Sequence, residues 1–237
     1  MALTRTLANL RIKLLAAKAV YTATRIQPLS RLNLRTFILE PQRYEALTAD
    51  LLSLPVPTTI VVAGKVLPVP QTAEEVADSI TYGQRLYFEQ LEEFDIGVVL
   101  RYICGYYYPL ATGCTWDETE ALVFGRKVLS SLVKDLYPVA KHLTQLMATL
   151  VENERKLLYR EPTKQERAAG IDRLAKFAPL SNLMFLASAF GCTQAQVPAQ
   201  PYKDCLVRFM LAKEQAAFNE RLADIHRKET APKQTRK

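Results

Sequence analysis

Residues 129–150, LSSLVKDLYPVAKHLTQLMATL, contain the clearest periodic pattern in the chain. Apolar side chains recur there at steps of three and four, which places them on one face of an α-helix. The eight positions are Leu129, Leu132, Val133, Leu136, Ala140, Leu143, Met147 and Leu150. Pro138 interrupts the pattern and predicts either a kink or two helices that meet at Tyr137. The stretch predicts a helical protein.

Capping signals indicate further helices on both sides of this stretch. A threonine followed three residues later by glutamate is typical of a helix start, and it occurs at Thr72, Thr115 and Thr163. We expect the signal at Thr115 to open the long periodic helix. Pro109 is expected to end one helix, and Gly191 another. Further helices are expected over residues 44–54, 81–93, 96–108, 172–177, 180–190 and 202–227.

Two segments favour extended structure. Residues 58–70, TTIVVAGKVLPVP, place two β-branched runs around Ala63–Lys65, which predicts a small hairpin. Pro68 and Pro70 lack an amide donor, so the second strand is expected to be an edge that ends there. Residues 32–39, LNLRTFIL, alternate loosely and predict a short strand. The expected fold class is mainly α: a multi-helix bundle with one small β hairpin near the start and an amphipathic N-terminal helix.

The net charge of +7 is concentrated at the two ends of the chain. Residues 1–39 hold seven basic side chains and no acidic one, residues 226–237 hold five bases and one acid, and the middle is mildly acidic. The first end carries one apolar stripe, which predicts a helix that docks onto the body or a partner, although a transit peptide shares this composition. The stripe consists of Leu3, Leu7, Leu10, Leu14, Ala17 and Tyr21.

Three regions follow from these patterns. Residues 1–57 are expected to form a basic N-terminal extension with a helix and a strand. Residues 58–228 are expected to form a helical body that begins with the hairpin, and residues 229–237 a basic disordered tail. The most apolar uncharged run, residues 183–190, is far shorter than the ~20 residues that a bilayer requires.

The composition offers little support for several kinds of chemistry. The 8 glycines include no G-x-G and no G-K-[ST], so a phosphate-binding loop has no template. The 4 cysteines form no C-x-x-C pair, and the 2 histidines, His142 and His226, suggest no triad. We expect the cysteines to be buried small hydrophobic residues in a reducing compartment. No cofactor, no metal and no catalytic residue is predicted.

Two other groups of residues allow more than one interpretation. Paired carboxylates such as Glu74-Glu75 are expected to be solvated acids at helix starts, although two of them could converge on a site. Tyr106-Tyr107-Tyr108 resembles a base-stacking surface, but such surfaces usually carry interleaved Lys or Arg. We therefore expect these tyrosines to pack in a core or an interface.

Short stretches between residues 58 and 228 follow one another in an informative order. They are Thr59–Lys65 with Pro68 and Pro70, Ile80–Gln84, Tyr137-Pro138, Ala169–Asp172 with Leu174 and Phe177, Leu186-Ala187, Gln200–Tyr202, and Glu214, Phe218, Arg221 and Leu222. In this order they resemble the tail assembly chaperones of long-tailed phages, particularly those of Bacteroidetes phages and prophages. Residues 1–57 lie outside the resemblance.

The resemblance implies a non-enzymatic helical protein of the host cytoplasm. Such chaperones bind and solubilise the apolar tape-measure protein during tail assembly and recruit tail-tube proteins, and a homo-oligomer is compatible with this role. We expect no membrane association. The partner is expected on the apolar face of the last helix or on the N-terminal stripe. The residues on the last helix are Leu206, Phe209, Met210, Phe218, Leu222, Arg227 and Lys228.

Two alternatives belong to other functional classes. The chain could be a structural virion component whose amphipathic ends insert into neighbouring subunits. It could also be a nucleic-acid-associated protein that uses its basic ends, although nucleic acid is not favoured, because any basic tail gives weak, salt-dependent binding.

Overall fold

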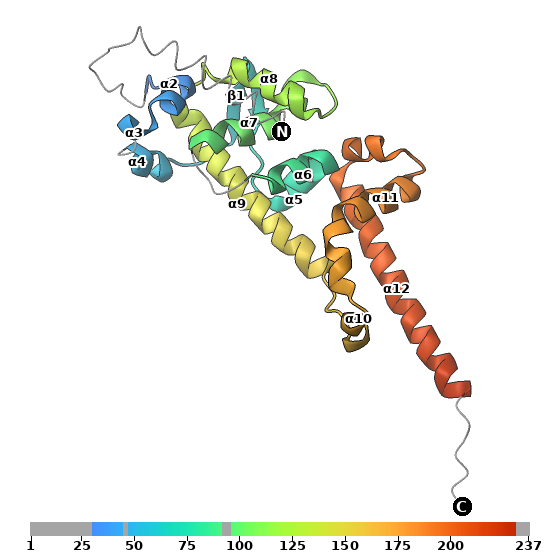
Figure 1. Ribbon diagram of the computed structural model, residues 1–237. Helices are drawn as coiled ribbons and strands as arrows, with labels where there is room; N and C mark the ends of the chain where they lie inside the picture. The colour runs from blue at the N-terminus through green and yellow to red at the C-terminus, as the bar shows by residue number, and fades with distance from the viewer. Residues whose placement is uncertain (1–29, 45–46, 92–95, 231–237) are drawn as a thin grey trace, which may run out of the picture. The chain divides into compact units, whose positions relative to one another are not determined.

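The computed structural model describes residues 30–44, 47–91 and 96–230, which are coloured in Figure 1. Within these residues the chain forms eleven α-helices, two 3₁₀-helices and one two-stranded antiparallel sheet. The predicted fold class, mainly α with one small hairpin near the start, is confirmed. The predicted N-terminal helix lies outside the described residues, as does the predicted tail from residue 231 onward.

The elements follow one another along the chain as labelled in Figure 1. They are α2 (Leu34–Leu39), α3 (Pro41–Tyr44), α4 (Thr48–Ser53), β1 (Thr59–Val62), β2 (Lys65–Pro68), α5 (Ala73–Ser79), α6 (Tyr82–Glu89), α7 (Ile96–Thr112), α8 (Glu118–Val128), α9 (Val133–Leu158), α10 (Lys164–Ala168), η3 (Ile171–Phe177), α11 (Ala178–Phe190), η4 (Gln194–Ala199) and α12 (Tyr202–Thr230).

The chain divides into two compact units that interleave in sequence. Unit 1 comprises Met1–Val69, Glu92–Thr112 and Thr119–His142, and unit 2 comprises Pro70–Leu91, Gly113–Glu118 and Leu143–Lys237. Helix α9 contributes its first part to unit 1 and the rest to unit 2. The three predicted regions are consecutive stretches of chain, whereas the units are assembled from separate segments. Those regions therefore remain a prediction.

The hairpin forms where it was predicted. Val61 of β1 lies opposite Val66 of β2 in an antiparallel pair, and β2 ends at Pro68. The two turn residues both have positive φ, 51° at Ala63 and 80° at Gly64. This is the pattern of a type I′ turn, whose twist matches that of the flanking strands.

The strand predicted over residues 32–39 is wrong, because Leu34–Leu39 form helix α2. The side-chain oxygen of Asn33 accepts a hydrogen bond from the amide of Thr36 at 2.9 Å, which caps the first turn. Leu34 and Phe37 lie nearly one helical turn apart, and both are fully buried. The loose alternation of the segment concealed this three-residue spacing.

The long helix predicted from Thr115 onward is also wrong. Helix α8 begins three residues later, at Glu118, and the chain leaves helical geometry after Val128. The break is stabilised by backbone hydrogen bonds from the first turn of α2, since the amide of Leu34 donates to the carbonyl of Ser131 at 2.9 Å. The start of α2, which is distant in sequence, thus supplies the hydrogen-bond partners that a continuous helix would provide at this point.

Two prolines lie inside helices rather than at their ends. Pro109 was expected to end α7, but that helix continues to Thr112, whose hydroxyl donates to the Tyr108 carbonyl at 2.7 Å. Pro138 was expected to cause either a kink or a junction of two helices at Tyr137; it lies within the single helix α9, which excludes the junction. Apolar side chains on both sides of Pro138 are buried, and their burial offsets the helical hydrogen bond that proline removes.

The core of unit 1 is rich in aromatic side chains. Tyr106, Tyr107 and Tyr108 are all buried, which confirms the expectation of core packing. The Tyr107 hydroxyl donates to the carbonyl of Pro68 at 3.3 Å, which ties α7 to the hairpin. The Phe37 ring lies edge-on to Tyr137 at 6.0 Å. These aromatic contacts join α2, α7, α9 and the hairpin.

The cysteines only partly follow the sequence expectation. Cys104 and Cys205 are buried, whereas Cys192 is half-buried and Cys114 is exposed. Burial raises the pKa of the Cys104 thiol well above its usual range, and it raises that of Cys205 to about 12. Both buried thiols therefore stay protonated near neutral pH.

The core of unit 2 depends on a close approach at Gly83 in α6. A Cβ atom at this position would lie 2.9 Å from the Pro198 carbonyl oxygen and equally close to the Trp116 ring. Real Cβ contacts are longer than this, so α6 packs against η4 because residue 83 has no side chain.

We predict that Gly83→Ala destabilises unit 2 by about 1–3 kcal/mol, because the added methyl group meets a backbone carbonyl that cannot rotate away. Urea unfolding followed by the fluorescence of Trp116, the single tryptophan, measures this change. Gly125→Ala is the matched control, since its Cβ would meet the Cys104 sulfur at 3.3 Å and a side chain can yield. Unchanged stability of Gly83→Ala would contradict the prediction.

Candidate partner-binding surface

Helix α12 starts at a fixed point in unit 2. The backbone of Thr81 pairs with that of Pro201, and the amide of Tyr202 donates to the carbonyl of Ile80 at 3.0 Å. About two turns further, the Phe209 ring stacks on Phe185 at 5.4 Å. Backbone and aromatic contacts therefore orient the first half of α12 against α6 and α11.

A buried polar cluster lies beside this start. Arg85 of α6 is only 5% exposed, and its Nε donates to Glu154 Oε2 of α9 at 2.9 Å. The Tyr202 hydroxyl donates to the same carboxylate oxygen at 3.1 Å, and Arg85 also pairs with Glu89 at 3.0 Å. One carboxylate therefore joins three helices, because it is the shared acceptor for two buried donors.

The cluster shifts the pKa values of its members away from neutrality. Burial alone would lower the pKa of Arg85, but the carboxylates of Glu154 and Glu89 outweigh it and the pKa is raised. Burial, with Glu154 acting in the same direction, raises the pKa of Tyr82 to about 12 and also raises that of Tyr202. The guanidinium therefore stays charged and both phenols stay neutral at physiological pH.

Further contacts hold α12 as far as its middle. The Lys213 ammonium donates to the carbonyl of Leu157 at 2.6 Å, and Arg160 pairs with Glu220 at 2.6 Å. Beyond Glu220, every side chain from residue 221 to residue 228 is exposed. Figure 1 shows this part of α12 continuing as a helix beyond α11. Nothing in the described part of unit 2 covers it.

The exposed part of α12 carries an apolar stripe. Leu211 and Phe218 are 57% and 56% exposed, unusual values for large apolar side chains on one helix. At 100° per residue, the stripe occupies about 60° of the helix circumference. We call it the α12 stripe; its members are Val207, Leu211, Phe218, Leu222 and Ile225, all exposed.

A second group of exposed apolar side chains lies just before α12 in the sequence. Leu174 and Phe177 of η3 and Leu180 and Met184 of α11 are each at least half exposed. Their spacings of three, three and four residues are those of one helical side. We call this group the α11 patch. Unit 2 thus exposes large apolar side chains on two consecutive segments, which monomeric surfaces seldom do.

The seven residues predicted for partner binding do not form one surface. Leu206 and Phe209 are half-buried against the rest of unit 2, while Met210 is 37% exposed. Phe218 and Leu222 belong to the α12 stripe. Arg227 and Lys228 are exposed in the last turns, where Arg227 pairs with Asp224 at 3.1 Å.

Sequence reasoning missed Val207 and Leu211 of the stripe and did not assign the α11 patch to a partner. Val207 and Leu211 are four residues apart, so their spacing was visible. The sequence did not reveal that Leu206 and Phe209 would occupy the core and leave the neighbouring face uncovered. Arg85 gave no local signal, because its half-buried partner Glu154 lies 69 residues away.

Among the described residues, no group of three or more His, Cys, Asp or Glu side chains is arranged to hold a metal ion. None of the described helices combines the length and the apolar character that crossing a bilayer requires.

Comparison with known proteins gives no relative. No protein-family model, no curated protein and no solved structure matches the chain. Functional inference therefore rests on the surfaces described above and on the resemblance of short stretches.

We predict that Glu154→Leu costs about 2–4 kcal/mol of unfolding free energy, because it leaves the buried Arg85 charge without its main partner. The double variant Arg85→Leu/Glu154→Leu should lose less than the sum of the two single variants, since no unpaired charge then remains. Urea titration of all three variants measures the coupling. Additive losses would show that the pair is not coupled.

We also predict that unit 2 loses stability between pH 10 and pH 12. The folded state binds the Tyr82 proton more tightly than the unfolded chain, so this stabilisation is complete below pH 10 and disappears as pH approaches 12. Tyr82→Phe should flatten the curve of unfolding free energy against pH between pH 10 and pH 12. The control is Tyr159→Phe, which changes an exposed tyrosine in the same way. Identical curves for both variants would refute the assignment.

Proposed function

We propose that this chain is a non-enzymatic binding protein that covers the apolar face of a partner helix with its α12 stripe. The observation that carries the proposal is the α12 stripe, a set of exposed large apolar side chains that runs from Val207 to Ile225. Removing apolar surface from water is favourable by roughly 25 cal/mol per Å². A partner that covers the stripe therefore gains binding free energy.

The stripe has the geometry that helix pairing requires. Leu211, Phe218 and Ile225 are spaced by seven residues each, which is the repeat of one core position in a coiled coil. The flanks are charged with both signs, since Glu214 and Asp224 lie near Arg221 and Lys228. Mixed flanking charges select a partner helix and its orientation rather than a general anion or cation.

The proposed partner is the tape-measure protein during phage tail assembly. This choice rests on the resemblance of residues 58–228 to tail assembly chaperones, whose client is a long helical protein with exposed apolar stripes. Covering those stripes would keep the client in solution without any chemical step. The α11 patch adjoins α12 in sequence and is the proposed second contact, for the client or for a tail-tube protein. We place this activity in the host cytoplasm.

The same stripe would also suit a permanent contact in a virion. Particle composition separates the two roles, because an assembly chaperone is absent from finished particles and a structural component is present in fixed stoichiometry. The nucleic-acid alternative depends mainly on the basic ends, and residues 1–29 and 231–237 lie outside the described part of the chain.

Co-expression with the tape-measure protein of the same phage tests the proposal. We expect the full-length chain to raise the soluble yield of the client, and the variant Phe218→Asp/Leu222→Asp to lower that yield at least about fivefold. Each side chain contributes about 1.5–3 kcal/mol when buried, and an aspartate cannot be buried unpaired. Ala216→Asp is the control for added charge, since it places one aspartate on the opposite face of α12.

Equal soluble yields with the stripe variant and with wild type would refute the role of the stripe. A yield that falls equally with Ala216→Asp would attribute the effect to charge alone. A change in the oligomeric mass of the isolated chain, without a change in client yield, would assign the stripe to self-association instead.

A further inference from the structure

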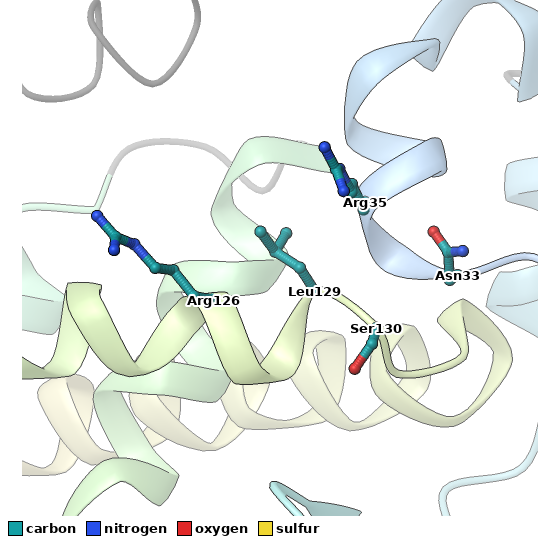
Figure 2. Close-up of a pocket in the computed structure, with 5 residues that line it drawn as sticks. All are labelled: Asn33, Arg35, Arg126, Leu129 and Ser130. Atoms are coloured by element: carbon teal, nitrogen blue, oxygen red, sulfur yellow. The ribbon is translucent and has the colours of Figure 1, made fainter. Parts of the chain in front are cut away.

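Unit 1 contains a pocket of about 400 Å³ that none of the preceding assignments uses. It lies where the start of α2 meets the end of α8 (Figure 2). The lining residues are Asn33, Arg35, Arg126, Leu129 and Ser130.

The pocket is built on backbone contacts between distant segments. The amide of Arg35 donates directly to the carbonyl of Leu129 at 3.0 Å, so two lining residues are bonded to each other. Asn33 forms a bridge with Leu132, and the amide of Val133 donates to the carbonyl of Leu32 at 2.9 Å. These bonds hold α2 against the turn between α8 and α9, which makes the pocket a preformed feature of unit 1.

The polar groups of the pocket are mainly cationic. Arg35 comes from α2 and Arg126 from α8, and both side chains are exposed. Figure 2 shows Leu129 between the two arginine side chains. Among the residues that the structure describes, neither guanidinium has a carboxylate partner. The Asn33 side-chain oxygen is already used by Thr36, so the two arginines are the main charged donors available to a ligand.

We propose that this pocket binds an acidic peptide segment of a partner protein. Figure 2 shows the two arginine side chains lying apart, so separate carboxylates of the segment would accept hydrogen bonds from Arg35 and from Arg126, and an apolar side chain between them would pack on Leu129. Arginine suits this task because its planar fork pairs with carboxylates through two parallel hydrogen bonds. The apolar surface of Leu129 between the charges favours a peptide over a free anion, which has nothing to place there.

A nucleic acid fits the pocket less well. The described lining residues include no aromatic ring on which a base could stack. A phosphodiester backbone is usually bound along a track of basic residues and not in a single pocket. The ends of the chain itself are not suitable ligands, because residues 1–29 and 231–237 contain five and three bases and no acid. The charge of the pocket is therefore complementary to an acidic segment and not to either basic end of the chain.

Fluorescence anisotropy with a labelled peptide of alternating glutamate and leucine tests the proposal on the full-length chain. We expect saturable binding that weakens about tenfold in Arg35→Gln and in Arg126→Gln, since each loses a charge-assisted hydrogen bond. Lys127→Gln is the matched control. It removes the same charge from the adjacent exposed position of α8, which does not line the pocket, and should change affinity less than twofold.

Three results would overturn the proposal. If Lys127→Gln weakened peptide binding equally, the effect would come from the overall positive charge of the protein and not from the pocket. Unchanged affinity in both arginine variants would exclude the pocket as the binding site. Tighter binding of a 12-base-pair DNA duplex, lost in the same arginine variants, would make nucleic acid the ligand.

Two further measurements keep the result interpretable. The arginine variants should unfold at the wild-type urea concentration, because both side chains are exposed and unpaired among the described residues. The stripe variant Phe218→Asp/Leu222→Asp should retain full peptide affinity, since the α12 stripe belongs to unit 2 and the pocket to unit 1. Failure of one site therefore leaves the other unaffected.

Discussion

The shared carboxylate of Glu154 is the constraint on which unit 2 depends. It accepts hydrogen bonds from Arg85 and Tyr202, so α6, α9 and α12 meet at one half-buried acceptor. A buried guanidinium is costly unless it is paired, and this cost makes alternative packings of the three helices unfavourable. Together with the backbone pairing of Thr81 with Pro201 and the ring contact of Phe209 with Phe185, this contact fixes the start of α12. The face of α12 that turns away from these contacts presents the apolar stripe to solvent.

The two units expose different chemistry for different reasons. In unit 2, the apolar surface is left over after Leu206, Phe209 and Leu186 have filled the available core. In unit 1, the pocket results from backbone pairing between the α2 segment and the turn after α8, which positions Arg35 and Arg126 around Leu129. The two proposed contacts, one with a helical client and one with an acidic segment, therefore involve different units of the chain.

Local chemistry explains which elements were predictable. The hairpin at residues 59–68 follows from two β-branched runs around Ala63-Gly64, and the cap at Thr163 follows from one hydroxyl and one carboxylate three residues apart. The errors arise where distant contacts decide. Helix α2 is stabilised by burial of Phe37 against Tyr137, and the break after Val128 by hydrogen bonds from residues 32–35. Neither contact leaves a trace in the local pattern.

The amino-acid sequence by itself determined that residues 202–227 form a helix with apolar side chains, because helical periodicity is a local property. Only the tertiary structure decided which of these side chains are covered, since burial depends on neighbours that come from other segments. Phe209 lies against Phe185, while Phe218 has the same chemistry and remains exposed. Which residues form the candidate surface is therefore decided by tertiary packing. The pairing of Arg85 with Glu154, which are 69 residues apart, is likewise decided by tertiary packing and not by the local sequence.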